Sequence, residues 1–196
     1  MDVTRPSLLL RIRDANDQDA WQSFYGIYRP LLVRYGRATG LCADDADDLA
    51  QQVMSVVHQK IDAFEYNPKS GRFRGWLHTL VCNRSSNLKR GRGVANRAQE
   101  KVAAQERRRE EDQVTPDQIF NQLWMQEHLW HCLKQLELEV EATTFQVFQQ
   151  VVFEEQSAAK VADELGVTVQ NVHTIKWRLT KRVGELMKDL VGEELD

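Results

Sequence analysis

The segment that most constrains the fold is SAAKVADELGVTVQNVHTIKWRLTKRVGELM, which covers residues 157–187. Ser157 can cap the start of a short helix, because its hydroxyl accepts a hydrogen bond from a backbone N–H of the first turn. Thr168 can cap a longer helix in the same way. Gly166 lies between them, where glycine most easily adopts a positive φ. The segment therefore predicts two consecutive helices joined by a tight turn.

The spacing of Ala162, Gly166 and Val172 is typical of a helix-turn-helix. A small residue lies where the helices cross, glycine makes the turn, and a branched apolar residue packs the second helix back. A plain helical hairpin would also use glycine and leucine, but the flanking basic residues favour DNA binding. The expected core is completed by Val161, Leu165, Val167 and Ile175.

The second helix of this motif has an apolar face, formed by Val172, Ile175, Leu179 and Leu186, and an opposite polar face. Gln170 and Asn171 can hydrogen-bond to base edges, and Trp177 suits either the outer face or partial core packing. Basic side chains suited to phosphates are Lys176, Arg178, Lys181 and Arg182. The predicted DNA-contacting residues are Thr168, Val169, Gln170, Asn171, His173, Thr174, Lys176, Trp177, Arg178 and Lys181.

Charge is strongly divided along the chain, although the formal net charge is only −3. Residues 69–109 carry a net charge of +10, and residues 110–164 carry −10. Residues 165–190 are basic again, at +3. A single charged run is usually a solvated helix face. Two basic blocks, each beside a helical motif, instead favour two surfaces that face a polyanion.

The remaining pattern predicts an all-α protein with two small helical domains. Helices are expected at residues 7–40 with a break or bend near Pro30, at 44–64, at 73–90, at 118–139 and at 142–154. The sequence GRG at residues 91–93 is expected to end the third of these helices. The predicted divisions are residues 1–92 for the first domain, 93–119 for a charged linker, 120–190 for the second domain and 191–196 for an acidic tail.

No apolar stretch is long enough to span a membrane, and the N-terminus lacks the pattern of a signal peptide. Three widely separated cysteines argue against a disulfide framework, and we expect the protein to work in a reducing cytoplasm.

The helix at residues 73–90 has amide and basic side chains on one face, namely Asn83, Ser86, Asn87 and Arg90. The preceding loop adds Tyr66, Asn67, Lys69 and Arg72, whereas Phe73 and Trp76 have the spacing of core residues.

The acidic stretch DDADDLAQQVM, residues 44–54, predicts a helix start. Asp44 is the expected N-cap, and Asp45 and Asp47 suit the positive end of the helix dipole. Ala46, Leu49, Val53 and Val57 form the expected buried stripe. The outward face holds Asp48, Gln51, Gln52 and Ser55.

A metal or catalytic role for the aspartates is disfavoured. A calcium loop from Asp44 would need glycine and glutamate where Leu49 and Ser55 stand. No polar partner is placed for acid–base catalysis. Zinc binding by His128, His131 and Cys132 is a weaker alternative, because a fourth ligand is missing. We therefore expect no catalytic residue, no metal and no cofactor.

Three segments together resemble the bacterial sigma-70 family, in its extracytoplasmic-function (ECF) group. They are DADDLAQQV at residues 45–53, FRGWLHTLVCNRSSNLKR at 73–90 and the helix-turn-helix at 157–183. Residues 8–90 resemble a sigma-2 domain and residues 120–190 a sigma-4 domain. No segment between them is long enough for a sigma-3 domain.

The resemblance implies a non-enzymatic cytoplasmic protein that binds core RNA polymerase and promoter DNA. Asp48, Gln51 and Gln52 would contact the β′ clamp helices. The loop and helix from Tyr66 to Arg90 would bind the melted minus-ten element, and the second domain would read the minus-35 element and bind the β flap. An anti-sigma protein is a further candidate partner.

Two departures from the family pattern concern its contact residues: Gln52 replaces a usual glutamate, and Ile175 and Lys176 stand where many members carry arginine and leucine.

The rival interpretation is a helix-turn-helix regulator that forms no holoenzyme. That rival leaves the acidic helix and the basic helix of the first half unexplained.

Overall fold

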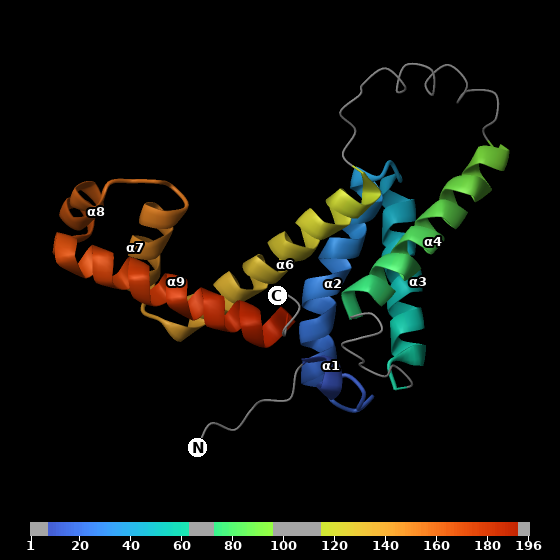
Figure 1. Ribbon diagram of the computed structural model, residues 1–196, viewed down its shortest axis with the longest axis horizontal. Helices are drawn as coiled ribbons and strands as arrows, with labels where there is room; N and C mark the ends of the chain where they lie inside the picture. Colours follow the sequence, from blue (N-terminus) through green and yellow to red (C-terminus); the bar gives the residue numbers. More distant parts are fainter. Residues whose placement is uncertain (1–7, 63–72, 96–114, 192–196) are drawn as a thin grey trace, which may run out of the picture. The chain divides into compact units, whose positions relative to one another are not determined.

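The structure is a computed structural model that describes residues 8–62, 73–95 and 115–191. Within these ranges it contains α-helices and no strand, which confirms the predicted all-α class. The chain divides into two compact units, residues 1–127 (unit 1) and 128–196 (unit 2) (Figure 1). The division falls inside one helix, α6, and each unit is described by itself below.

Unit 1 is built on three helices that pack side by side, α2 on α3 and α3 on α4. Their apolar residues recur every three or four positions, so each helix has one face to bury. Ala46, Leu49, Val53 and Val57 are fully buried, which confirms the predicted stripe. The helices of unit 1 are α1 (Leu8–Arg11), α2 (Gln18–Ala38), α3 (Ala43–Lys60), α4 (Phe73–Ala95) and the first half of α6 (Pro116–Glu139).

The helix predicted at residues 7–40 is wrong as one element. It is interrupted between α1 and α2, whereas Pro30 lies within α2. Asp17 is the N-cap of α2 and accepts a hydrogen bond from the Ala20 N–H at 3.0 Å. The Arg11 guanidinium donates two hydrogen bonds of 2.9 Å to the Asp17 carboxylate, and these bonds hold the pKa of Asp17 below its usual value. A local side-chain cap thus starts a new helix here.

Two other predicted helix ends are also wrong. The N-cap of α3 is Cys42, whose sulfur lies 3.5 Å from the Asp45 backbone nitrogen, so Asp44 is the second residue of the helix instead of its cap. At the other end of unit 1, α4 continues through residues 91–93 to Ala95. Glycine weakens a helix interior by only about 1 kcal/mol, so two glycines do not force a stop.

The first half of α6 belongs to unit 1 because of its aromatic residues. Phe120 and Trp124 are fully buried. The Trp124 ring lies 5.4 Å from that of Tyr28 and 6.4 Å from that of Phe73, and the Phe120 ring lies 5.9 Å from that of Tyr35. Ring separations of about 4.5–7 Å are those of interacting aromatic pairs. These contacts join α6 to α2 and α4.

The start of α6 is fixed by a reciprocal cap. The Gln118 N–H donates to Thr115 Oγ1 at 3.2 Å, and the Thr115 N–H donates to Gln118 Oε1 at 2.8 Å. Pro116 follows the cap, at the position where its missing N–H is not needed. Thr115 and Pro116 therefore start a helix, although the sequence suggested linker chemistry.

Unit 2 contains the second half of α6, then α7 (Ala142–Val152), α8 (Ala158–Leu165) and α9 (Val169–Val191). Leu133 and Leu136 of α6 are buried against this core, and Leu129 packs on it partly buried. From α7, Val147 and Phe148 are buried in the same cluster. The two helices predicted at residues 118–139 and 142–154 are confirmed to within two residues.

Candidate nucleic-acid interfaces

The helix-turn-helix predicted in unit 2 is present, with the predicted caps. Ser157 Oγ accepts from the Lys160 N–H at 3.3 Å, and Thr168 Oγ1 accepts from the Asn171 N–H at 3.1 Å. Gly166 ends α8 in the left-handed region, with φ of 65°. The Val167 N–H donates to the Ala162 carbonyl at 3.0 Å, which closes the turn.

Replacing Gly166 with alanine is expected to lower the free energy of unfolding of unit 2 by about 1 kcal/mol. The cause is backbone strain alone, since a Cβ at this position would have nothing within 4 Å. The measurement is urea unfolding followed by circular dichroism. Gly166→Asn is the matched variant and should cost less, because asparagine tolerates the left-handed region. Equal costs for the two variants would contradict this explanation.

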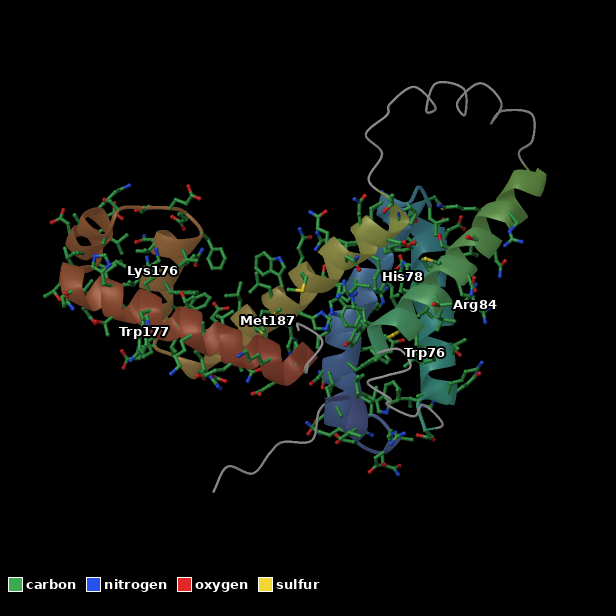
Figure 2. All side chains as sticks on the ribbon, viewed as in Figure 1. Trp76, His78, Arg84, Lys176, Trp177 and Met187 are labelled. Carbon is green, nitrogen blue, oxygen red and sulfur yellow. The ribbon has the colours of Figure 1, made fainter. Side chains whose placement is uncertain are left out.

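The predicted faces of α9 are confirmed. Val172, Ile175, Leu179 and Leu186 are buried, and Ala162 and Val161 of α8 pack in the same core. Every predicted DNA-contacting residue from Thr168 to Lys181 is exposed. Trp177, for which core packing was an equal alternative, is 67% exposed. Its ring lies 5.6 Å from Lys181 Nζ and borders a shallow hollow with His173, Lys176 and Thr180. Figure 2 labels Trp177 and Lys176 on α9.

Arg182 differs from the other basic residues predicted to suit phosphates. Its guanidinium donates hydrogen bonds of 2.9 and 3.0 Å to the two carboxylate oxygens of Glu139, at the end of α6. The hydrogen bond to Glu139 raises the pKa of Arg182. A guanidinium held by two bonds to a carboxylate is already neutralised. Arg182 therefore pairs α9 with the end of α6 within unit 2, and its contact with phosphate stays a prediction.

In unit 1, one face of α4 is polar and exposed. We call it the minus-ten face after the role that the family resemblance implies for it, and its members are Asn83, Ser86, Asn87 and Arg90. The buried face of the same helix holds Phe73, Leu77, Val81 and Ser85, so Phe73 is a core residue as predicted. Trp76 is half-buried with its ring 5.6 Å from that of Phe73. The predicted loop residues Tyr66, Asn67, Lys69 and Arg72 lie outside the described residues.

The outward face of α3 is mostly exposed, and we call it the docking face after the polymerase contact that the family resemblance implies. Asp48, Gln51 and Ser55 are exposed, and Gln52 is half-buried. Asp47 beside them forms an ion pair of 2.7 Å with Arg29 of α2. Asp45 is buried in the first turn. Of the four aspartates, Asp48 thus lies on the docking face, as predicted.

The alternative zinc set of His128, His131 and Cys132 does not come together as a ligand group in the described part of the chain. Burial lowers the pKa of His131, and Lys134 adds to this effect. Burial also raises the pKa of the Cys132 thiol to about 11. A metal ligand thiol must be a thiolate, so a buried thiol with a raised pKa fits a core residue better.

A different group, which sequence reasoning missed, is brought together in unit 1: His78, Cys82 and Asp117. His78 and Cys82 are four residues apart on α4, a spacing visible in the sequence. Asp117 comes from the start of α6, and only the docking of that helix reveals it. Burial and the contact with Cys82 raise the pKa of the nearby Tyr35 phenol, so its hydroxyl keeps its proton.

The comparisons with known proteins agree with the geometry of unit 1. Residues 24–94 match the family model for Sigma-70 region 2. These residues include most of α2, all of α3 and nearly all of α4, and hence the docking face and the minus-ten face. Residues 24–94 therefore form a segment similar to sigma-70 region 2.

A more particular similarity is to the ECF RNA polymerase sigma factor RpoE of Cereibacter sphaeroides. The two are 30% identical over 78 residues, which is 40% of this chain and 42% of the relative. The match thus spans less than half of that protein. It indicates distant homology to the ECF group, as the sequence motifs predicted.

Among the described residues, every helix is either too short or too polar to span a membrane.

Proposed function

We propose that the chain is an ECF sigma factor, which binds core RNA polymerase, directs it to specific promoters and helps to melt the minus-ten region. The observation that carries the proposal is the sigma-70 region 2 match over residues 24–94. The exposed faces of α3 and α4 lie within those residues. The holoenzyme would work in the cytoplasm, where polymerase and promoters are.

On the docking face, Asp48, Gln51 and Gln52 contact the β′ clamp helices. An exposed carboxylate flanked by two amides offers one ionic and several hydrogen-bonding contacts to a partner helix. Gln52 has no charge where the family usually has glutamate. Asp48 therefore supplies the charge among these three residues.

The minus-ten face of α4 binds bases that become unpaired when the promoter opens. Its two asparagines, serine and arginine present hydrogen-bond donors and acceptors to base edges and phosphates. A surface that binds single strands better than duplex shifts DNA towards the open state without ATP. The loop residues Tyr66, Asn67, Lys69 and Arg72 complete this surface in the proposal and receive a flipped base.

In unit 2, α9 reads the minus-35 element in the major groove. The residues at its start, Val169, Gln170 and Asn171, reach base edges, and Lys176, Arg178 and Lys181 contact phosphates. Exposure of all of these side chains supports this role. Binding of unit 2 to the β flap and control by an anti-sigma protein are further parts of the proposal that rest on the family resemblance.

The proposal is tested by mixing the purified chain with core polymerase and measuring complex formation by gel filtration. A sigma factor co-elutes with the core enzyme. A helix-turn-helix regulator that forms no holoenzyme binds promoter duplex but elutes apart from core. That second result would favour the rival function.

Replacing Lys176 and Arg178 with alanine is expected to weaken minus-35 duplex binding at all sequences alike. The slope of log affinity against log salt should fall by about 2, because each phosphate contact contributes about 1. The measurement is fluorescence anisotropy over a salt series. Lys188→Ala is the matched control, an exposed lysine near the other end of α9. A control slope that falls as much would argue against these contacts.

A further inference from the structure

The group of His78, Cys82 and Asp117 lies within unit 1, at the contact between α4 and the start of α6 (Figure 2 labels His78). The Nε2 atom of His78 is 3.2 Å from Cys82 Sγ and 3.1 Å from Asp117 Oδ1. The three ligand atoms all lie within 4.8 Å of one another. One imidazole nitrogen thus faces a thiol and a carboxylate at once.

We propose that this group is a zinc site, with His78, Cys82 and Asp117 as its three protein ligands. Imidazole nitrogen, thiolate and carboxylate oxygen are the ligand types that zinc takes in proteins. Bond lengths of about 2.0–2.3 Å in a tetrahedron place neighbouring ligand atoms about 3.3–3.6 Å apart. The two separations measured from His78 Nε2 are a few tenths of an ångström shorter than this, and the three ligand atoms all lie within 4.8 Å of one another. A small movement of the side chains would therefore accommodate the ion.

The surroundings suit a metal with one open position. This set also has three protein ligands, but its ligand atoms lie together, which those of His128, His131 and Cys132 do not in the described residues. The side chain of His78 is 26% exposed and that of Asp117 is 74% exposed, so water reaches the site and can be the fourth ligand. The Tyr35 hydroxyl lies 3.3 Å from Cys82 Sγ and can donate a hydrogen bond to the thiolate. Such a donor orients and stabilises a ligand from outside the coordination sphere.

The position of the site indicates what zinc would do. Two ligands belong to α4 and one to α6, so a bound ion joins the start of α6 to the helix that carries the minus-ten face. His78 and Cys82 are not members of that face, so the ion leaves its four residues free. Zinc would therefore act as a structural clamp on unit 1. This inference does not depend on the proposed function, because the ligands come from the geometry alone.

The test uses the full chain, freed of metal with a chelator and titrated with Co²⁺ as the spectroscopic probe. We expect saturation at one ion per chain, strong visible bands of a tetrahedral site and a thiolate-to-cobalt charge-transfer band in the near ultraviolet. Added Zn²⁺ should remove these bands. Absence of saturable binding would overturn the proposal and leave only the hydrogen bonds seen here.

Variants identify the ligands. Cys82→Ser should abolish the charge-transfer band, and Asp117→Asn should weaken Co²⁺ binding by at least about tenfold. Cys42→Ser is the matched control and should keep the band, because serine also caps a helix. Persistence of the band in Cys82→Ser, or its loss in Cys132→Ser, would overturn the assignment.

Amide hydrogen exchange gives a structural measurement that also applies to variants that bind no metal. Zn²⁺ should slow amide hydrogen exchange in the first two turns of α6 in the natural sequence and not in Cys82→Ser. Circular dichroism checks that the Cys82→Ser chain keeps its helices. Equal slowing in both proteins would contradict the clamp, because it would place the zinc effect elsewhere.

Discussion

Charge reversal at Asp48, Asp48→Lys, is expected to weaken the binding of core RNA polymerase by about 10- to 100-fold, or about 1.4 to 2.7 kcal/mol. Asp48 is exposed on α3 and supplies the charge among the three proposed contact residues. In the proposed docking Asp48 makes the one ionic contact, and a lysine there reverses the sign of that contact. The measurement is a fluorescence binding titration of labelled chain with core enzyme.

The matched control is Asp62→Lys, the same change of charge at an exposed position just beyond the other end of α3. It should leave polymerase binding nearly unchanged. Binding of minus-35 duplex by the full chain should be the same for both variants and the natural sequence. An equal loss of polymerase binding in the control, or a parallel loss of duplex binding, would count against the docking role.

Truncation of Trp124 to alanine is expected to lower the free energy of unfolding of unit 1 by about 3–5 kcal/mol. The side chain is 1% exposed and packs against the rings of Tyr28, Phe73 and Phe120. Its loss removes a large apolar area and leaves a cavity where α6 meets α2 and α4. Urea unfolding followed by circular dichroism gives the difference.

Trp130→Ala on the same helix is the control, since that tryptophan is 59% exposed. Its truncation should change the free energy of unfolding by about 0.5 kcal/mol or less. Comparable losses in the two variants would contradict the difference in packing between these two side chains. A large loss only for Trp124→Ala would support a unit 1 that includes the first half of that helix.

The elements that were predicted correctly have local signals. In the helix-turn-helix, Ser157, Gly166 and Thr168 each act on backbone groups within three or four residues of themselves, and Val172 follows the helical period. Spacing alone therefore indicates both the caps and the buried face. The same holds for the stripe on α3 and for the outward position of Asp48.

The errors come from competition between nearby groups and from contacts between distant ones. By residue type Cys42 is a weak candidate for a cap, because thiols are weak acceptors, and Asp44, two residues further on, is the stronger one. Arg11 and Asp17 form an ion pair at the break between α1 and α2, and the spacing of apolar residues gives no indication of that pair. The exact ends of these helices depend on side-chain geometry rather than on the spacing of apolar residues.

The contacts of α6 show the larger limit of sequence reasoning. Trp124 and Asp117 are far from α2 and α4 in the chain, so no spacing indicates that they meet Tyr28 and His78. By residue type Arg182 suits a phosphate contact, and only the tertiary fold shows that its guanidinium pairs with Glu139. The exposed face of α9 was predictable, but which of its cations remain free depends on the tertiary fold.

In the proposed function this chain turns core polymerase into a promoter-specific enzyme. The most direct measurement is run-off transcription with purified core polymerase and a set of promoter fragments from the genome of origin. We expect transcripts of defined length from a subset of fragments, only when the chain is added, and far fewer with Asp48→Lys. Absence of promoter-specific transcripts from every fragment, together with failure to bind core, would contradict the assignment as a sigma factor.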